Sequence, residues 1–152
     1  MNKKNKIYNI AIVGLGNIGS NLYQHLIKNK KIISNKNNVN FEIIYVCAKN
    51  IKKKRKVNIP KKKWLKNYLS VPKSNNIDIV IELIGGAEGP AKKLVFNALK
   101  NKKHVVTANK ALIAKYGDQL SKIAEKNNVN LEFEASVCGG VPIVRLLKEG
   151  LI

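Results

Sequence analysis

Residues 10–19 read IAIVGLGNIG, an apolar run that leads into three glycines with the spacing G-x-G-x-x-G. The glycines follow a strand predicted over 9–14 and open a helix predicted over 17–29, whose apolar residues form one stripe. A strand, a glycine turn and a helix in this order are typical of a dinucleotide-binding unit, where backbone N–H groups and the helix dipole receive the pyrophosphate. The residues expected to contact the cofactor here are Gly14, Leu15, Gly16, Asn17, Ile18 and Gly19.

The rest of the chain repeats this alternation of short apolar runs and longer helical patterns. Further strands are predicted over 41–48, 77–86, 104–108 and 129–136, and further helices from Pro90, over 110–127 and, for one or two turns, over 64–69, with polar loops over 35–40 and 49–63. Apolar strands of this kind favour a parallel sheet that is buried on both faces. The repeated strand and helix therefore predict an α/β fold with a Rossmann-type, doubly wound, mostly parallel sheet.

Length and composition exclude several classes of protein. The chain has 152 residues, which is about one domain, and no apolar run approaches the roughly 18 residues of a membrane span, so we expect a cytoplasmic protein with no membrane partner. The formal charge of +20 would suggest nucleic acid, but the basic residues are almost all lysines spread along the chain, without a recognisable DNA-binding motif. A nucleic-acid partner is therefore not favoured.

The end of the second predicted strand bears on cofactor preference. NAD-specific sites usually have Asp or Glu at this point, where the carboxylate accepts hydrogen bonds from the ribose 2′-OH. Here the strand ends in VCAKN, and Lys49 is followed by further basic residues at 52–55. A cation would attract a 2′-phosphate that a carboxylate would repel, so we predict NADP(H) in preference to NAD(H), with Lys49 as the phosphate partner.

Three later strings join the glycine turn in a recognisable order. DIVIELIGGAEGPA (78–91), HVVTANKALIAKYG (104–117) and FEASVCGGVPIVRLL (133–147) make the chain resemble the amino-terminal half of homoserine dehydrogenase. The resemblance implies an oxidoreductase that interconverts L-homoserine and L-aspartate 4-semialdehyde with NAD(P)(H), a step in the biosynthesis of threonine and methionine. It also implies a site lysine at Lys110 and a bound monovalent cation, Na⁺ or K⁺, near Glu134, Val137, Gly139 and Val141.

The residues themselves are compatible with such a site. Thr107, Ala108 and Lys110 lie at the predicted carboxyl end of a parallel strand, where ligands gather in open α/β sheets, and Gly85 ends the preceding strand. A lysine there could polarise a carbonyl oxygen or neutralise a substrate carboxylate, and a solvent lysine at a helix N-terminus would be unfavourable. We therefore expect Gly85, Thr107, Ala108 and Lys110 at the cofactor, with Lys110 also as the candidate catalytic residue.

The expected organisation is a NAD(P)-binding domain over 1–140 and, over 141–152, the start of a helix that leads into a substrate domain. The resemblance places the main catalytic lysine beyond Ile152, so we expect a fragment that is inactive alone, from an enzyme that acts on a small-molecule substrate as a homo-oligomer. The alternatives are a stand-alone nucleotide-binding module and a basic nucleic-acid-binding protein. Aspartate-semialdehyde dehydrogenase is weaker, because it needs a catalytic cysteine and Cys138 has no evident histidine partner.

Overall fold

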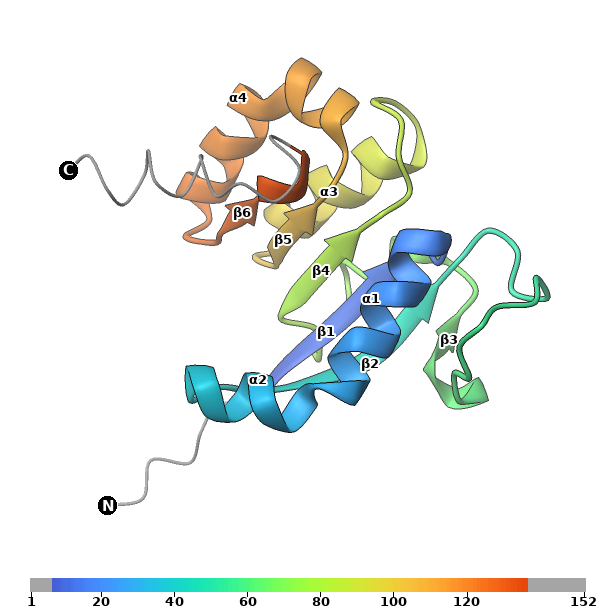
Figure 1. Cartoon of the computed structure of the whole chain (residues 1–152). Helices are drawn as coiled ribbons and strands as arrows, with labels where there is room; N and C mark the ends of the chain where they lie inside the picture. The colour runs from blue at the N-terminus through green and yellow to red at the C-terminus, as the bar shows by residue number, and fades with distance from the viewer. Residues whose placement is uncertain (1–6, 137–152) are drawn as a thin grey trace.

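The computed structural model of the chain describes residues 7–136, and the overall arrangement is α/β (Figure 1). Within these residues the strands are β1 (Ile7–Val13), β2 (Asn40–Cys47), β3 (Trp64–Leu65), β4 (Ile79–Glu82), β5 (His104–Thr107) and β6 (Leu131–Glu132). The α-helices are α1 (Asn17–Lys28), α2 (Lys30–Asn37), α3 (Pro90–Lys100) and α4 (Lys110–Lys126), and short 3₁₀ turns lie at Lys61–Lys63, Tyr68–Ser70 and Glu134–Ser136.

The six strands form one sheet in the order β3-β2-β1-β4-β5-β6, and each neighbouring pair is parallel. Helices α1 and α2 lie over one face of the sheet, and α3 and α4 lie over the other (Figure 1). Each face has its own hydrophobic cluster, one built around Ile12 and Ile43 and the other around Leu94 and Leu112. The predicted doubly wound, Rossmann-type sheet is therefore confirmed.

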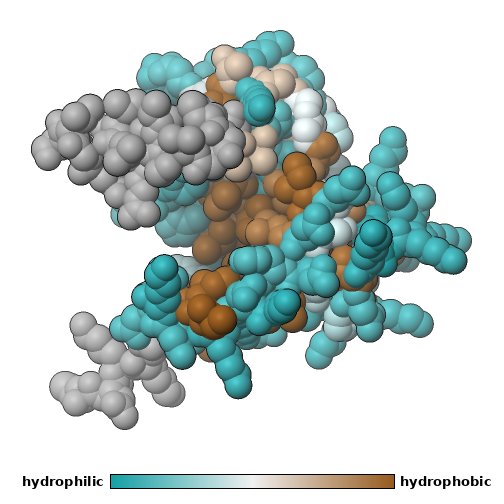
Figure 2. All heavy atoms as spheres, viewed as in Figure 1, coloured by the Kyte–Doolittle hydropathy of each residue, from teal (hydrophilic) through white to brown (hydrophobic). Residues whose placement is uncertain are grey.

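Within the described residues, the helices cover the two faces of the sheet unevenly. In Figure 2 the hydrophobic side chains gather in the middle of the view, where Figure 1 has β4 and β5 without α1 in front of them. Val106 of β5 is 36% exposed, and Ile84, just after β4, is 38% exposed. Within residues 7–136, the expectation of a sheet buried on both faces therefore does not hold at Val106 of β5.

Several element predictions need correction. Residues 64–69 were expected to be helical, but Trp64 and Leu65 form a short edge strand that pairs with Val46 and Cys47, and only the 3₁₀ turn Tyr68–Ser70 follows. The strand predicted over 129–136 is limited to Leu131–Glu132. Helix α2 occupies part of a segment that was predicted as a loop; it buries no residue, so it carries no apolar stripe that the sequence could reveal.

Some predictions cannot be compared with the structure because they fall outside the described residues. These are the helix expected over 141–152 and the residues Val137, Cys138, Gly139 and Val141. No helix within residues 7–136 has the length and apolar character that crossing a membrane requires.

Candidate functional site

The turn between β1 and α1 is built from three glycines with different constraints. Gly14 has φ +108°, and a Cβ there would lie 2.4 Å from the backbone of Leu83. A Cβ on Gly19 would lie 1.9 Å from the carbonyl oxygen of Gly14, so this glycine lets α1 approach the turn. A Cβ on Gly16 would meet no atom within 4 Å. Gly14 and Gly19 are therefore required for the fold, whereas the space at Gly16 is open to a ligand.

A cavity of about 610 Å³ adjoins this turn at the carboxyl ends of β1, β2 and β4. Among the described residues that line it, four are basic and none is acidic. The full lining consists of Val13, Gly14, Leu15, Gly16, Cys47, Ala48, Lys49, Asn50, Lys53, Arg55, Lys66, Tyr68, Leu83, Ile84 and Pro90. The carboxyl ends of parallel strands beside a glycine turn are where dinucleotides bind in such sheets, and a lining whose charged residues are all basic suits a phosphate-rich ligand.

Arg55 organises the basic loop that follows β2. Its guanidinium donates hydrogen bonds to the carbonyl oxygens of Asn50 at 2.7 Å, Lys53 at 2.8 Å and Ile51 at 3.3 Å. Its Nε donates to the carbonyl oxygen of Leu15 at 3.0 Å, which joins the loop to the glycine turn. In the sequence Arg55 is one of several basic residues after the second strand, but in the structure it anchors this loop.

A second set of polar residues links the loops after β4 and β5. Glu82 is fully buried, and its Oε1 accepts hydrogen bonds from the backbone N–H groups of Ile84 at 2.7 Å and Gly85 at 3.1 Å. Its Oε2 accepts a hydrogen bond of 2.5 Å from the hydroxyl of Thr107, which in turn accepts from the N–H of Asn109 at 3.0 Å. The two loops are thus joined through one buried carboxylate.

Asn109 closes this network and begins α4. Its side-chain amide donates to the carbonyl oxygen of Gly86 at 2.7 Å, and its Oδ1 accepts from the N–H of Leu112 as the helix cap. Lys110 is the next residue and is exposed as the first residue of α4. Sequence reasoning missed Glu82; the available signal was the carboxylate at the end of the otherwise apolar run IVIE, residues 79–82.

The structure separates the expected site residues into three groups. Gly14, Leu15, Gly16 and Lys49 line the cavity, and Asn17, Ile18 and Gly19 form the first residues of α1 behind it. Gly85 and Ala108 lie on the loops after β4 and β5, Thr107 ends β5 and Lys110 begins α4, and none of the four lines the cavity itself. Glu134 lies in a 3₁₀ turn after β6 and does not line the cavity.

The carboxylate of Glu134 has an unusual environment. Both of its oxygens are buried, and neither has a hydrogen-bond partner among the described residues. A buried carboxylate without a partner is costly, and a cation is the group that compensates it best. No cluster of three His, Cys, Asp or Glu side chains suited to a metal exists in the part of the chain that the structure describes.

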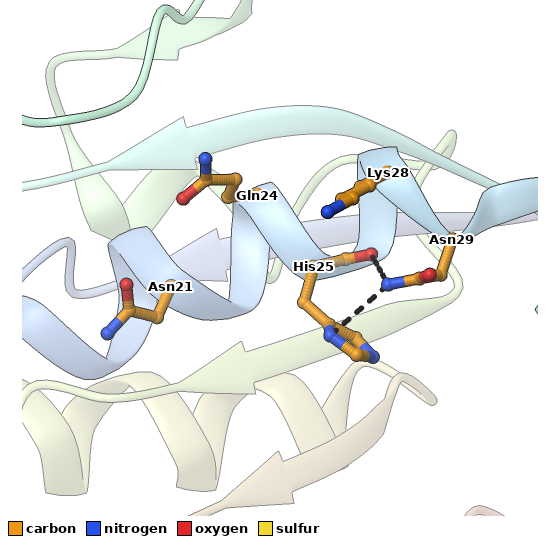
Figure 3. A pocket seen from close by; sticks show the side chains of 5 residues that line it. All are labelled: Asn21, Gln24, His25, Lys28 and Asn29. Carbon is orange, nitrogen blue, oxygen red and sulfur yellow. Dashed lines mark hydrogen bonds between the residues drawn. The ribbon is translucent and has the colours of Figure 1, made fainter.

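A separate polar depression of about 360 Å³ lies on the solvent side of α1 (Figure 3). It is lined by Asn21, Gln24, His25, Lys28 and Asn29, all from one helix and its end. The amide of Asn29 donates to the carbonyl oxygen of His25 at 3.0 Å and lies 3.2 Å from its Nδ1. Because one helix alone forms this surface, it encloses nothing, and we do not regard it as the site.

Two titratable groups near the cavity have shifted pKa values. Burial raises the pKa of the Cys47 thiol, which keeps it protonated and unreactive. In the loop after β4, hydrogen bonds from Lys115 and Tyr116, with a smaller contribution from Lys92, lower the pKa of Glu88 to about 2. Glu88 therefore stays ionised and ties the start of α3 to α4.

Comparisons with known proteins agree with this geometry. The family model described as "Homoserine dehydrogenase, NAD binding domain" matches residues 14–134. The homoserine dehydrogenase of Neisseria gonorrhoeae is 39% identical over 146 residues, and that of Bacillus subtilis is also 39% identical; the match covers 96% of this chain but 33% and 34% of theirs. This chain thus spans about one third of the length of these relatives.

Solved structures extend the agreement to the fold. The crystal structure of a homoserine dehydrogenase from Thiobacillus denitrificans matches with a TM-score of 0.83 and 35% identity, over 96% of this chain and 33% of that chain. The enzyme from S. aureus at pH 7.5 matches with a TM-score of 0.80 and 37% identity, over 87% of this chain and 34% of that chain. From the glycine turn, the parallel sheet and these matches together it follows that the chain belongs to the homoserine dehydrogenase family and comprises its NAD-binding domain.

Proposed function

We propose that this chain is the nucleotide-binding third of a homoserine dehydrogenase, which interconverts L-homoserine and L-aspartate 4-semialdehyde with NADP(H) in preference to NAD(H). The observation that carries the proposal is the glycine turn, whose Gly16 faces open space at the edge of a cavity with basic lining. Backbone N–H groups of the turn and the positive end of α1 bind the pyrophosphate. The remaining two thirds of such an enzyme would complete the substrate site and hold it as a homo-oligomer.

The preference for NADP(H) rests on the loop after β2. Lys49 is exposed and lines the cavity just beyond the strand end, where an NAD-specific site would carry an acid. Arg55 already donates to four backbone carbonyls, so its guanidinium is engaged in holding the loop. Lys49 is therefore the cation that we assign to the 2′-phosphate.

Hydride transfer would take place beside the ends of β4 and β5, on the side of the glycine turn away from β2. The nicotinamide, when bound, supplies or accepts the hydride. Gly85, Thr107 and Ala108 lie at the adjoining ends of β4 and β5, and Lys110 polarises the carbonyl oxygen of the aldehyde or pairs with the substrate carboxylate. The buried carboxylate of Glu134 fits a monovalent cation, Na⁺ or K⁺, that Val137, Gly139 and Val141 would help to hold.

Parallel titrations with NADPH and NADH test this proposal, with energy transfer from Trp64, the single tryptophan, as the signal. We expect the chain to bind NADPH more tightly than NADH. We expect Lys49→Glu to weaken the binding of NADPH about tenfold, or roughly 1.4 kcal/mol, with little effect on the binding of NADH. Lys31→Glu is the control, because it makes the same charge change at the exposed start of α2. Equal binding of both cofactors would overturn the preference, and binding of neither would overturn the dinucleotide assignment.

A further inference from the structure

Glu82 is the only fully buried charged residue among those that the structure describes. It is a fully buried carboxylate, and it is absent from every ion pair among the described residues. Its charge is compensated by hydrogen bonds from two backbone N–H groups and one hydroxyl. Burying a charge in this way is costly, and a neutral side chain could fill the same space. Such a departure from ordinary core composition is expected where function requires it.

The loop that Glu82 holds has few other restraints. Gly85 and Gly86 have φ values of +83° and +80°, in the left-handed region, and a Cβ on either would meet no atom within 4 Å. Packing therefore does not define the path of the backbone there. The hydrogen bonds from the N–H groups of Ile84 and Gly85 to Glu82 do so, together with the bond from Asn109 to the carbonyl oxygen of Gly86.

Glu82 also acts on the next strand. Its second oxygen fixes the hydroxyl of Thr107, and this hydroxyl accepts the N–H of Asn109, which caps α4. Lys110 follows directly in the chain. One carboxylate thus sets the position of the cavity wall at Ile84 and of the helix start that carries Lys110.

From this geometry, and resting on the proposed function, we propose that Glu82 is a positioning residue for the nicotinamide half of the cofactor. In an open α/β sheet the dinucleotide spans the crevice at the carboxyl ends of the strands, with its pyrophosphate at the first glycine turn. The adenine half then lies towards β2, and the nicotinamide half lies over the loops after β4 and β5. Glu82 joins these two loops from beneath and holds them in the shape that receives the nicotinamide.

Two ligands separate this role from a purely structural one. NADPH occupies both halves of the crevice, whereas 2′,5′-ADP carries only the adenine half. In Glu82→Gln one oxygen becomes an NH₂ group that faces the Thr107 hydroxyl, so one loop loses its acceptor. Thr107→Val removes the hydroxyl with little change of shape. We expect each variant to weaken the binding of NADPH about tenfold and to change the Kd of 2′,5′-ADP less than twofold.

Two further variants serve as controls. Thr107→Ser keeps the hydroxyl that Glu82 accepts, so it should recover most of the NADPH affinity that Thr107→Val loses. Ile77→Val removes one methylene from a fully packed core position and should lower the melting temperature without changing the ratio of the two affinities. The unmodified chain tests the proposed function separately, because failure to bind either ligand would refute dinucleotide binding itself.

The remaining outcomes bear on Glu82 alone. If the unmodified chain binds NADPH no more tightly than 2′,5′-ADP, the loops do not receive the nicotinamide and the inference fails. It fails equally if Glu82→Gln weakens both ligands to the same extent, since that is the result of a general loss of structure. The inference is supported if Glu82→Gln and Thr107→Val both lose affinity for NADPH selectively and Thr107→Ser does not.

Discussion

Gly16 and Gly19 differ in what a single methyl group would meet. Gly16 has an ordinary φ of −73° and open space, whereas Gly19 faces the carbonyl oxygen of Gly14. We expect Gly19→Ala to destabilise the chain by about 1–3 kcal/mol, because the backbone of the turn must move to relieve the overlap. Gly16→Ala should melt at the same temperature but bind NADPH at least tenfold more weakly, because its methyl group stands where the pyrophosphate approaches. Thermal denaturation and NADPH titration measure both effects.

The contrast between these two variants makes the test specific. If Gly16→Ala lowered the melting temperature as much as Gly19→Ala, the glycine would serve packing and the ligand assignment would lose its support. Sequence spacing alone predicted that all three glycines form the turn between the first strand and the first helix, because the motif specifies backbone geometry directly. It did not reveal Arg55 or Glu82, since the contact that joins each of them to a second loop is distant in sequence: Leu15 lies 40 residues from Arg55, and Thr107 lies 25 residues from Glu82.

At the scale of elements, the strongly patterned segments were predictable and the weakly patterned ones were not. Helices α1, α3 and α4 each carry an apolar stripe that faces the sheet, and their starts were predicted correctly. Strand β3 has two residues, too few for any period, and it exists because β2 offers a free edge beside it. The missed elements are thus those whose stability comes from non-local pairing or whose side chains are not buried.

The contact of the loop after β4 with α3 and α4 depends on Glu88. Its Oε1 accepts hydrogen bonds from the hydroxyl of Tyr116 and, at 2.8 Å, from Lys115, and its Oε2 lies 3.3 Å from Lys92. These donors lower its pKa from 4.5 to about 2 in the folded chain. A folded-state pKa below the unfolded one contributes stability that is complete above pH 4.5 and is lost as the pH falls through 2.

The variant Glu88→Gln tests this pH dependence. Its melting temperature should lie below that of the unmodified chain by a constant amount above about pH 4.5, and the difference should shrink as the pH approaches 2. Melting curves recorded at several pH values measure it. Asp118→Asn is the matched control, because it removes an ion pair that lies within α4 alone. Its melting temperature should differ from that of the unmodified chain by much less than that of Glu88→Gln does. A difference that stays constant down to pH 2 would mean that the carboxylate of Glu88 contributes nothing through its charge.

At the scale of the whole molecule, the strand order explains where the site forms. With the order β3-β2-β1-β4-β5-β6, the chain runs towards one edge from β1 and then returns to continue from β4 towards the other. The connections therefore diverge between β1 and β4, and this divergence leaves a crevice at their carboxyl ends. Sequence reasoning reached the fold class because alternation of strands and helices restricts the topology, but the extent of each edge strand required the structure.

The net charge of +20 allows a last distinction, between a nucleotide site and a surface that binds nucleic acid. A protein that neutralises 6–10 phosphates loses about 10³–10⁵ in affinity between roughly 50 and 200 mM salt. A single cofactor held by backbone N–H groups and a few lysines should lose far less, so we expect NADPH binding to weaken by about tenfold or less over this range, and NADH binding less still. Energy transfer from Trp64 follows the cofactors, and the anisotropy of a labelled DNA duplex provides the comparison. If the duplex bound more tightly than NADPH at the higher salt, the lysines would form a nucleic-acid surface and the preference that we assign to Lys49 would lose its basis.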